Sequence, residues 1–161
     1  MCRATRHDAC ALKARGVGFS EIAACLGVRM YSTVRGSNCI YVAYTDKYVR
    51  DVLGKCWEQL DFLNNDTEGG MRHARQAKNS DMVKRASLLN KAREEFGFMS
   101  EIAGTVADKP SKLRGDRVDL LLFEEAGSNP VLLDTYIQSR ALVEILGDKF
   151  GIRVLWGTGG D

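Results

Sequence analysis

The sequence has few of the features that mark linkers, cross-links or membrane spans. It contains two prolines among 161 residues, so long extended linkers are not expected. No apolar run approaches the ~20 residues of a membrane span, and no apolar stretch follows the charged N-terminus, so neither a membrane protein nor a secreted one is predicted. The five cysteines are odd in number and form no CxxC pair, which argues against a zinc site and a disulfide framework. A reducing cytoplasm is the expected environment.

Net charge and composition are those of an ordinary globular protein and indicate no particular class of partner. A net charge of +2 is too near neutral to indicate a nucleic-acid partner by itself. Hydrophobic residues at 45% and charged residues at 27% are typical of a globular chain, and the length suits one domain. Cys25, Cys39 and Cys56 lie among apolar neighbours and are predicted in the core. His7 and His73 have no metal-ligating neighbours in sequence and are expected on the surface.

Short apolar segments alternate with amphipathic ones along the chain. The predicted strands cover residues 9–13, 39–44, 96–106, 118–123 and 150–156. The predicted helices cover residues 20–30, with Ile22, Ala23, Cys25 and Leu26 on one side, residues 46–63 after an N-cap at Thr45, and residues 131–146. This alternation predicts an α/β domain with a mainly parallel central sheet flanked by helices. Ligands of such sheets bind at the carboxyl ends of the strands.

Residues 71–95 differ in composition from the rest. Seven lysines or arginines fall between Arg72 and Arg93, against one aspartate, and the periodicity is weak. We expect a polar helical insertion or a pair of short helices. The basic side chains could contact DNA phosphates, although a solvated helical face is the plainer interpretation.

The first predicted strand ends in KARGVGFS, which is similar to the Walker A pattern GxxxxGK[ST]. Gly18 and Ser20 keep the final glycine and hydroxyl, but Phe19 occupies the lysine position. A cation could instead come from the start of the loop, and the next helix would add its N-terminal dipole. An ordinary strand–helix turn is the alternative. The predicted phosphate-binding residues are Lys13, Arg15, Gly16, Gly18 and Ser20.

Two acids, Glu124 and Glu125, follow the apolar segment VDLLLF. A buried strand ending in paired acids is typical of a Walker B motif, in which the first carboxylate holds Mg²⁺ and the second orients the attacking water. Ser20 is the other predicted metal contact, through its hydroxyl. The alternative is a helix start, where acids are favoured, but the following AGSNP is typical of a loop.

The last predicted strand is followed by Gly157-Thr158-Gly159, where the small hydroxyl could reach a γ-phosphate. Each of these signals is modest, but they occur in the order of a P-loop NTPase of the helicase-like type, with an additional strand between the nucleotide loops. Glu125, Glu124 and Thr158 are therefore the predicted catalytic residues.

The combination resembles the ATPase domain of the large terminase subunit of tailed bacteriophages. The resemblance rests on KARGVGFSE, SKLRGDR, LLLFEEAGSNP and FGIRVLWGTGGD, with the helix after CIYVAYT, and runs through most of the chain. Lys13 matches a variant Walker A loop whose lysine lies at the start. Glu124 and Glu125 match the Walker B pair. Residues 157–159 match the coupling motif.

The resemblance implies a function that the residues alone do not give. It implies a motor that hydrolyses ATP with Mg²⁺ and pumps double-stranded DNA into a procapsid. It further implies a capsid portal and a small terminase subunit as partners, a homo-oligomeric ring, no membrane, and the host cell cytoplasm as location. Residues 1–161 are then expected to be an ATPase domain truncated at both ends, without the nuclease domain of the family.

Three other interpretations stay open. Residues 19–35 resemble a helix-turn-helix pattern, with Gly27 in the turn and Val34 and Arg35 in the recognition helix, although its spacing is one residue too long. Another P-loop helicase or translocase would share the motifs. Because Phe19 replaces the usual lysine, a degenerate domain without hydrolysis is the third.

Overall fold

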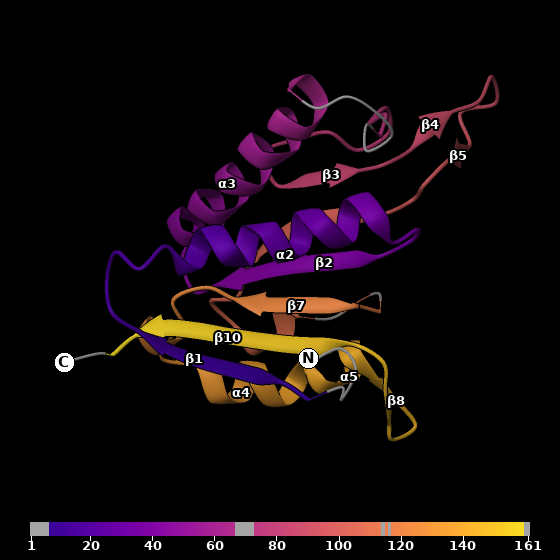
Figure 1. The fold of residues 1–161 in the computed structure, drawn as a ribbon. Coiled ribbons are helices and arrows are strands. Elements are labelled where there is room, and N and C mark those ends of the chain that lie inside the picture. The colour runs from indigo at the N-terminus through magenta and orange to yellow at the C-terminus, as the bar shows by residue number, and fades with distance from the viewer. Residues whose placement is uncertain (1–6, 67–72, 114, 116, 160–161) are drawn as a thin grey trace.

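A computed structural model describes residues 7–66, 73–113, 115 and 117–159. Its centre is a six-stranded sheet with the order β1-β10-β7-β2-β6-β3 (Figure 1). The strands are β1 (Ala9–Lys13), β10 (Ile152–Thr158), β7 (Leu120–Phe123), β2 (Asn38–Ala43), β6 (Glu101–Val106) and β3 (Val83–Arg85). All neighbours pair in parallel except β3, which is antiparallel to β6. The predicted mainly parallel sheet is confirmed, and β10 lies between β1 and β7, the strands that end in the two predicted nucleotide motifs.

Helices cover both faces of the sheet, as predicted. On one face lie α2 (Phe19–Thr33) and α3 (Asp46–Asn65), and on the other lie α4 (Leu132–Gln138) and α5 (Arg140–Val143) (Figure 1). Each layer has its own apolar core. Glycine at position 104 lets α3 pack closely on β6, because a Cβ there would collide with Val49 and Leu53 of α3. Thr45 directly precedes α3, as its sequence pattern predicts.

The helix-turn-helix interpretation is wrong, because residues 19–33 form one continuous helix. Gly27, expected in the turn, lies inside α2, where a Cβ would collide with the Tyr41 hydroxyl. That hydroxyl donates a hydrogen bond to Ala23 O at 2.7 Å. The glycine therefore lets the helix rest on a buried tyrosine of β2.

The prediction of which residues of α2 are buried is also wrong in part. Ala23 and Val28 are buried, but Ile22, Cys25 and Leu26 are exposed. The contacts with α3 and with Tyr41 select a face of α2 that is rotated from the one that periodicity favours. Cys39 and Cys56 are buried, as expected.

Residues 73–95 are not helical. They hold β3 and the two-residue strand β4 (Leu88–Leu89), which pairs with β5 (Glu95–Phe96) as a small projecting hairpin (Figure 1). Met71 and Arg72 lie outside the described residues. Several of the basic side chains pair with acids, since Lys78 and Arg85 both contact Glu101 of β6. His73, expected on the surface, is half-buried and stacks on Phe98 at 4.1 Å between ring centroids.

The single helix predicted over residues 131–146 is two short helices followed by a hairpin. The strands β8 (Glu144–Ile145) and β9 (Asp148–Lys149) pair across Leu146 and Gly147. Both turn residues have positive φ, of 49° and 93°, which is the backbone of a tight two-residue hairpin turn. Gly147 therefore closes a turn and does not end a helix. No helix among the described residues is long and apolar enough to span a membrane.

Candidate functional site

The predicted site residues come from four separate segments and meet at one edge of the sheet. Lys13 ends β1, Thr158 ends β10, and Glu124 and Glu125 directly follow β7. Since these strands are parallel neighbours, their carboxyl ends lie side by side. Ser20 reaches the same place from the first turn of α2.

Lys13 is at the centre of this cluster. Its ammonium lies 3.2 Å from Glu125 Oε2 and 3.4 Å from Thr158 Oγ1, and it donates a hydrogen bond to each. The side chain is 13% exposed, so it is directed into the site and away from solvent. The structure thus brings into direct contact the lysine, the acid and the threonine that the sequence predicts for the phosphate loop, the Walker B pair and the coupling motif.

Ser20 and Glu124 form a second pair beside it. Ser20 Oγ donates a hydrogen bond to Glu124 Oε1 at 3.0 Å. Burial raises the pKa of Glu124, and the Ser20 hydroxyl and Trp156 indole only partly oppose this. Glu124 Oε2 is buried without a hydrogen bond of normal geometry. An unpaired buried carboxylate oxygen next to a serine hydroxyl is a donor set that fits Mg²⁺, which takes few protein oxygens and completes its shell with phosphate and water.

Glu125 is held in a different environment from its neighbour. Its backbone is left-handed, with φ 46° and ψ 50°, a conformation that non-glycine residues rarely adopt and that is enriched at functional sites. The Thr158 backbone N–H donates to Glu125 Oε1 at 3.0 Å. Burial raises the pKa of Glu125, but the hydrogen bonds from Thr158 and Lys13 outweigh it and the net shift is downward. Adjacent acids with opposite pKa shifts are suited to different roles.

The glycine loop between β1 and α2 encloses a small cavity of about 190 Å³. Gly16 and Gly18 have φ of 76° and 72°, so both need the left-handed freedom of glycine. The cavity opens at the N-terminus of α2, where backbone N–H groups lack helical partners and attract anions. The residues that line it are Lys13, Gly16, Val17, Gly18, Phe19, Ser20, Glu21 and Lys55.

Two residues of this region differ from the sequence prediction. Arg15 is exposed and is not among the residues that line the cavity. Lys55, which does line it, comes from α3 and carries no local sequence signal, because it lies 35 residues beyond Ser20 on a helix predicted only for its apolar side. Only the packing of α3 on α2 reveals it.

The predicted coupling motif, residues 157–159, makes a close backbone contact with the loop after Glu125. A Cβ on Gly157 would lie 2.8 Å from Gly127 N, and a Cβ on Gly127 would lie 2.9 Å from Thr158 O. These glycines therefore allow a contact between two backbones that side chains would prevent. Gly159 continues past Thr158 and is exposed. Gly157 belongs to the predicted coupling motif, whereas Gly127 carries no sequence signal for this contact.

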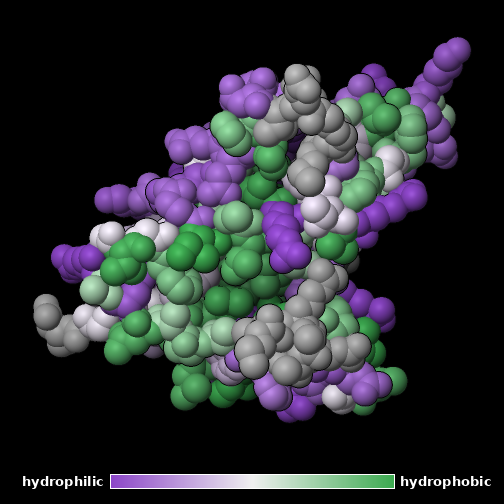
Figure 2. Space-filling model, viewed as in Figure 1, coloured by the Kyte–Doolittle hydropathy of each residue, from purple (hydrophilic) through white to green (hydrophobic). Residues whose placement is uncertain are grey.

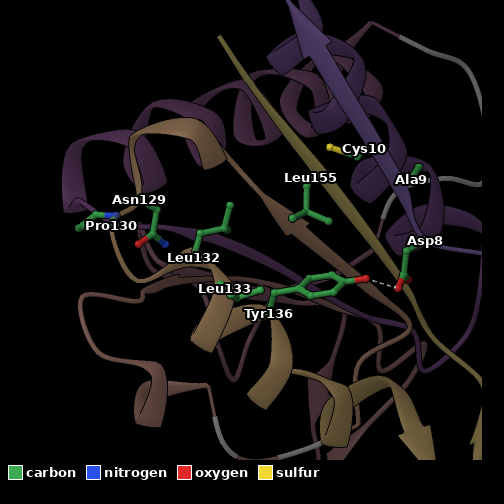
Figure 3. Close-up of a pocket in the computed structure, with 9 residues that line it drawn as sticks. All are labelled: Asp8, Ala9, Cys10, Asn129, Pro130, Leu132, Leu133, Tyr136 and Leu155. Atoms are coloured by element: carbon green, nitrogen blue, oxygen red, sulfur yellow. Dashed lines mark hydrogen bonds between the residues drawn. The ribbon is translucent and has the colours of Figure 1, made fainter. Parts of the chain in front are cut away.

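A larger cavity, of about 630 Å³, lies away from this cluster, between α4 and the edge strand β1 (Figure 3). Leu132, Leu133 and Tyr136 form one side of it, and the Tyr136 hydroxyl donates to Asp8 at 2.7 Å. Neither the glycine loop nor the acid pair lines this cavity. Its walls are largely apolar. Neither a lysine nor an arginine is among the described residues that line it.

No protein-family model matches the sequence, and no curated protein matches it significantly. Solved structures do share its fold. The ATPase domain of the large terminase of Thermus phage P74-26 has a TM-score of 0.68 and 19% identity, over 96% of this chain and 60% of that one. A variant of the same domain gives 0.68 at 18% identity. The large terminase of a thermophilic bacteriophage, solved in complex with ADP, has a TM-score of 0.60 and 14% identity, over 96% of this chain and 34% of that one.

At these identities the similarity is one of fold. The chain spans 60% of the length of the Thermus phage domain. It has the mixed α/β fold of phage large terminase ATPase domains, with a mainly parallel six-stranded sheet flanked by helices.

Proposed function

We propose that this chain is the ATP-hydrolysing motor domain of a phage DNA-packaging terminase. One observation carries the proposal: Lys13, Glu125 and Thr158 contact one another beside the Ser20–Glu124 pair, at the mouth of a glycine loop. The fold shared with a terminase ATPase domain, and with a large terminase solved in complex with ADP, supports the same function.

Each residue has a role that follows from its position. The loop amides between Gly16 and Ser20, with Lys13, would bind the phosphates of ATP. The cavity, at about 190 Å³, is smaller than the ~300 Å³ at which whole small-molecule sites begin, so it suits the phosphate end of a nucleotide. Ser20 and Glu124 would hold Mg²⁺, which supplies charge neutralisation of the phosphates.

Glu125 would orient the attacking water and accept its proton, because its carboxylate lies at the cluster and is held in place by hydrogen bonds from Thr158 and Lys13. Thr158 would sense the terminal phosphate, since its hydroxyl and backbone N–H already contact Lys13 and Glu125. Through the Gly127–Gly157 contact, a change at Glu125 would reach the end of β10 directly.

The partners belong to the same proposal. Double-stranded DNA is the expected cargo, with a capsid portal, a small terminase subunit and further copies of the chain around it. Hydrophobic side chains gather over β1 and α2 in Figure 2, where Leu12, Val17, Ile22 and Leu26 are exposed, and this supports a protein contact on that side.

Equilibrium binding of MgATP to the purified chain tests the proposal, beside Lys13→Ala and Phe19→Ala variants. We expect Lys13→Ala to abolish or strongly weaken binding. Phe19 packs on Trp156 at 5.6 Å between ring centroids, so Phe19→Ala should lower stability more than affinity. Failure of the unmodified chain to bind MgATP, or a greater loss of affinity in Phe19→Ala than in Lys13→Ala, would contradict the assignment. DNA-stimulated hydrolysis then separates a translocase from a static binding domain.

A further inference from the structure

Lys55 is a second cation at the phosphate cavity, contributed by a different helix from the loop. It lies near the middle of α3 and lines the cavity together with Lys13 and residues 16–21. Its ammonium pairs with the carboxylate of Glu21, in the first turn of α2. It is also close enough to Glu124 for that carboxylate to contribute to the raised pKa of Lys55, after the larger effect of Glu21.

We propose that Lys55 is a phosphate-binding residue, which leaves Glu21 and pairs with the nucleotide phosphates when they enter the cavity. This inference rests on the proposed function and assigns a second positive charge to the cavity, beside Lys13. The ligand class is a polyphosphate, recognised by two lysines that line the same cavity, one from the end of β1 and one from α3.

The charge of the site favours a second lysine beside Lys13. Phe19 occupies the place where this type of loop usually carries its lysine, and the exposed Arg15 is not among the residues that line the cavity. Lys13 is already paired with Glu125. A polyphosphate would therefore meet the carboxylates of Glu21, Glu124 and Glu125, and a second lysine at the cavity would offset this repulsion beyond what Lys13 and a bound Mg²⁺ supply.

The geometry allows Lys55 to change partners. Its side chain is 34% exposed and that of Glu21 is 52% exposed, so the pair is partly solvated and weak. A lysine ammonium on a flexible four-carbon stem can move between a carboxylate and a nearby phosphate without movement of the helix. Gln59 also joins α3 to α2, because its amide donates to Glu21 O at 3.3 Å and to Glu21 Oε2 at 3.4 Å.

The competing role is purely structural, with Lys55 and Glu21 joining two helices. The two roles predict opposite results for the two partners. If Lys55 binds phosphate, Glu21 competes with the ligand for it, so neutralising Glu21 should strengthen binding. If the pair only joins the helices, removing either partner should lower stability alike and leave affinity unchanged, or reduce it equally.

The test is isothermal titration of the purified chain with MgATP and, separately, with inorganic tripolyphosphate. We expect Lys55→Gln to weaken both ligands roughly ten- to hundredfold, as for loss of a charged hydrogen bond, and Lys55→Arg to retain most of the affinity. Glu21→Gln should bind at least as tightly as the unmodified chain. Lys47→Gln, on an exposed first-turn residue of α3, is the matched control and should change neither affinity.

Unchanged affinity in Lys55→Gln, or an equal loss in Lys55→Gln and Glu21→Gln, overturns the assignment. A loss in Lys13→Ala without one in Lys55→Gln rejects only Lys55 and leaves the ATPase proposal standing. Absence of MgATP binding by the unmodified chain rejects both. Thermal unfolding of each variant shows whether it is folded. If Lys55→Gln does not fold, Lys55→Arg still tests the proposal, because it should fold and retain most of the affinity.

Discussion

Lys13 Nζ lies 3.2 Å from Glu125 Oε2, so the cation assigned to phosphate and the carboxylate assigned to water are each other's partners. The two residues are 112 positions apart in the chain and meet only because β1 and β7 flank β10. Phosphate oxygens and Glu125 would compete for one ammonium. The carboxylate that orients water would therefore gain freedom when phosphate engages the lysine.

Replacing Glu125 by glutamine separates binding from chemistry. Glutamine can still accept the Thr158 N–H but cannot take a proton from water, so MgATP binding should persist. Turnover should fall by about 10²–10⁴, the usual contribution of a general base. Phosphate-release kinetics measure this, with the exposed Glu58→Gln variant as control. Turnover equal to that of the unmodified chain would rule out the role given to Glu125.

Replacing Gly157 by alanine should separate the backbone of β10 from the backbone at Gly127, which are in close contact at the site. The new Cβ would lie 2.8 Å from Gly127 N, so one segment must move. We expect a loss of about 1–3 kcal/mol in the free energy of unfolding, as for overpacking, together with reduced turnover.

Gly54→Ala is its matched control, because a Cβ at Gly54 meets nothing within 4 Å inside α3. That variant should gain about 0.5–1 kcal/mol from helix propensity. Urea unfolding and hydrolysis assays measure both variants. An equally stable and active Gly157→Ala variant would show that the close contact is dispensable.

Asp8 makes stability depend on pH. Burial raises its pKa, but hydrogen bonds from Arg153, Lys149 and Tyr136 hold that pKa well below the ordinary 3.8. An acid with a lowered folded pKa contributes stability above its unfolded pKa and loses it as the pH falls through the folded pKa. The protein should therefore lose stability as the pH drops below about 4.

Asp8→Asn should cost about 2–4 kcal/mol at pH 7, because it leaves Arg153 and Lys149 without their shared carboxylate. The difference from the unmodified chain should shrink at pH 3. Asp51→Asn, on an exposed part of α3, should stay within about 0.5 kcal/mol. Urea unfolding at both pH values measures this, and a pH-independent difference would contradict the ion-pair explanation.

The thiols should divide into two reactivity classes. Cys10 and Cys25 are exposed, whereas burial raises the pKa of Cys56 to about 12 and Cys39 is also buried. Since the thiolate is the reactive form, alkylation of the native chain should modify Cys10 and Cys25 long before the buried pair. Mass spectrometry of digests after timed labelling measures this. Early labelling of Cys56 would indicate that the α2–α3 layer opens readily.

The parts of the fold that the sequence predicts are those with strong local patterns. CIYVAY and VDLLLF are continuous apolar segments, and they form β2 and β7 in the middle of the sheet. The motifs that follow strands are also predictable, because parallel strands end at a common edge. Lys13, Ser20, Glu124, Glu125 and Thr158 therefore meet as the order of the motifs indicates.

The missed parts depend on contacts between distant residues. β3 to β5 have two or three residues each, too few for a period to appear, and Arg85 is held by Glu95 and Glu101. The hairpin after α5 depends on positive φ at Leu146, which no side-chain preference would indicate. Lys55 reaches the site only through helix packing.

The strand that ends in Lys13 and the glycine loop, β1, lies at the edge of the described sheet, with β10 as its one neighbour there. Its backbone amides are thus protected on a single side. Asp8, which directly precedes β1, pairs with Lys149 of β9 and Arg153 of β10 and so holds the start of the strand in place. Such a strand exchanges its amide hydrogens through local opening at a lower free energy than the strands inside the sheet. A ligand bound in the cavity of the glycine loop should consequently lower deuterium uptake along β1, even where uptake elsewhere in the molecule does not change.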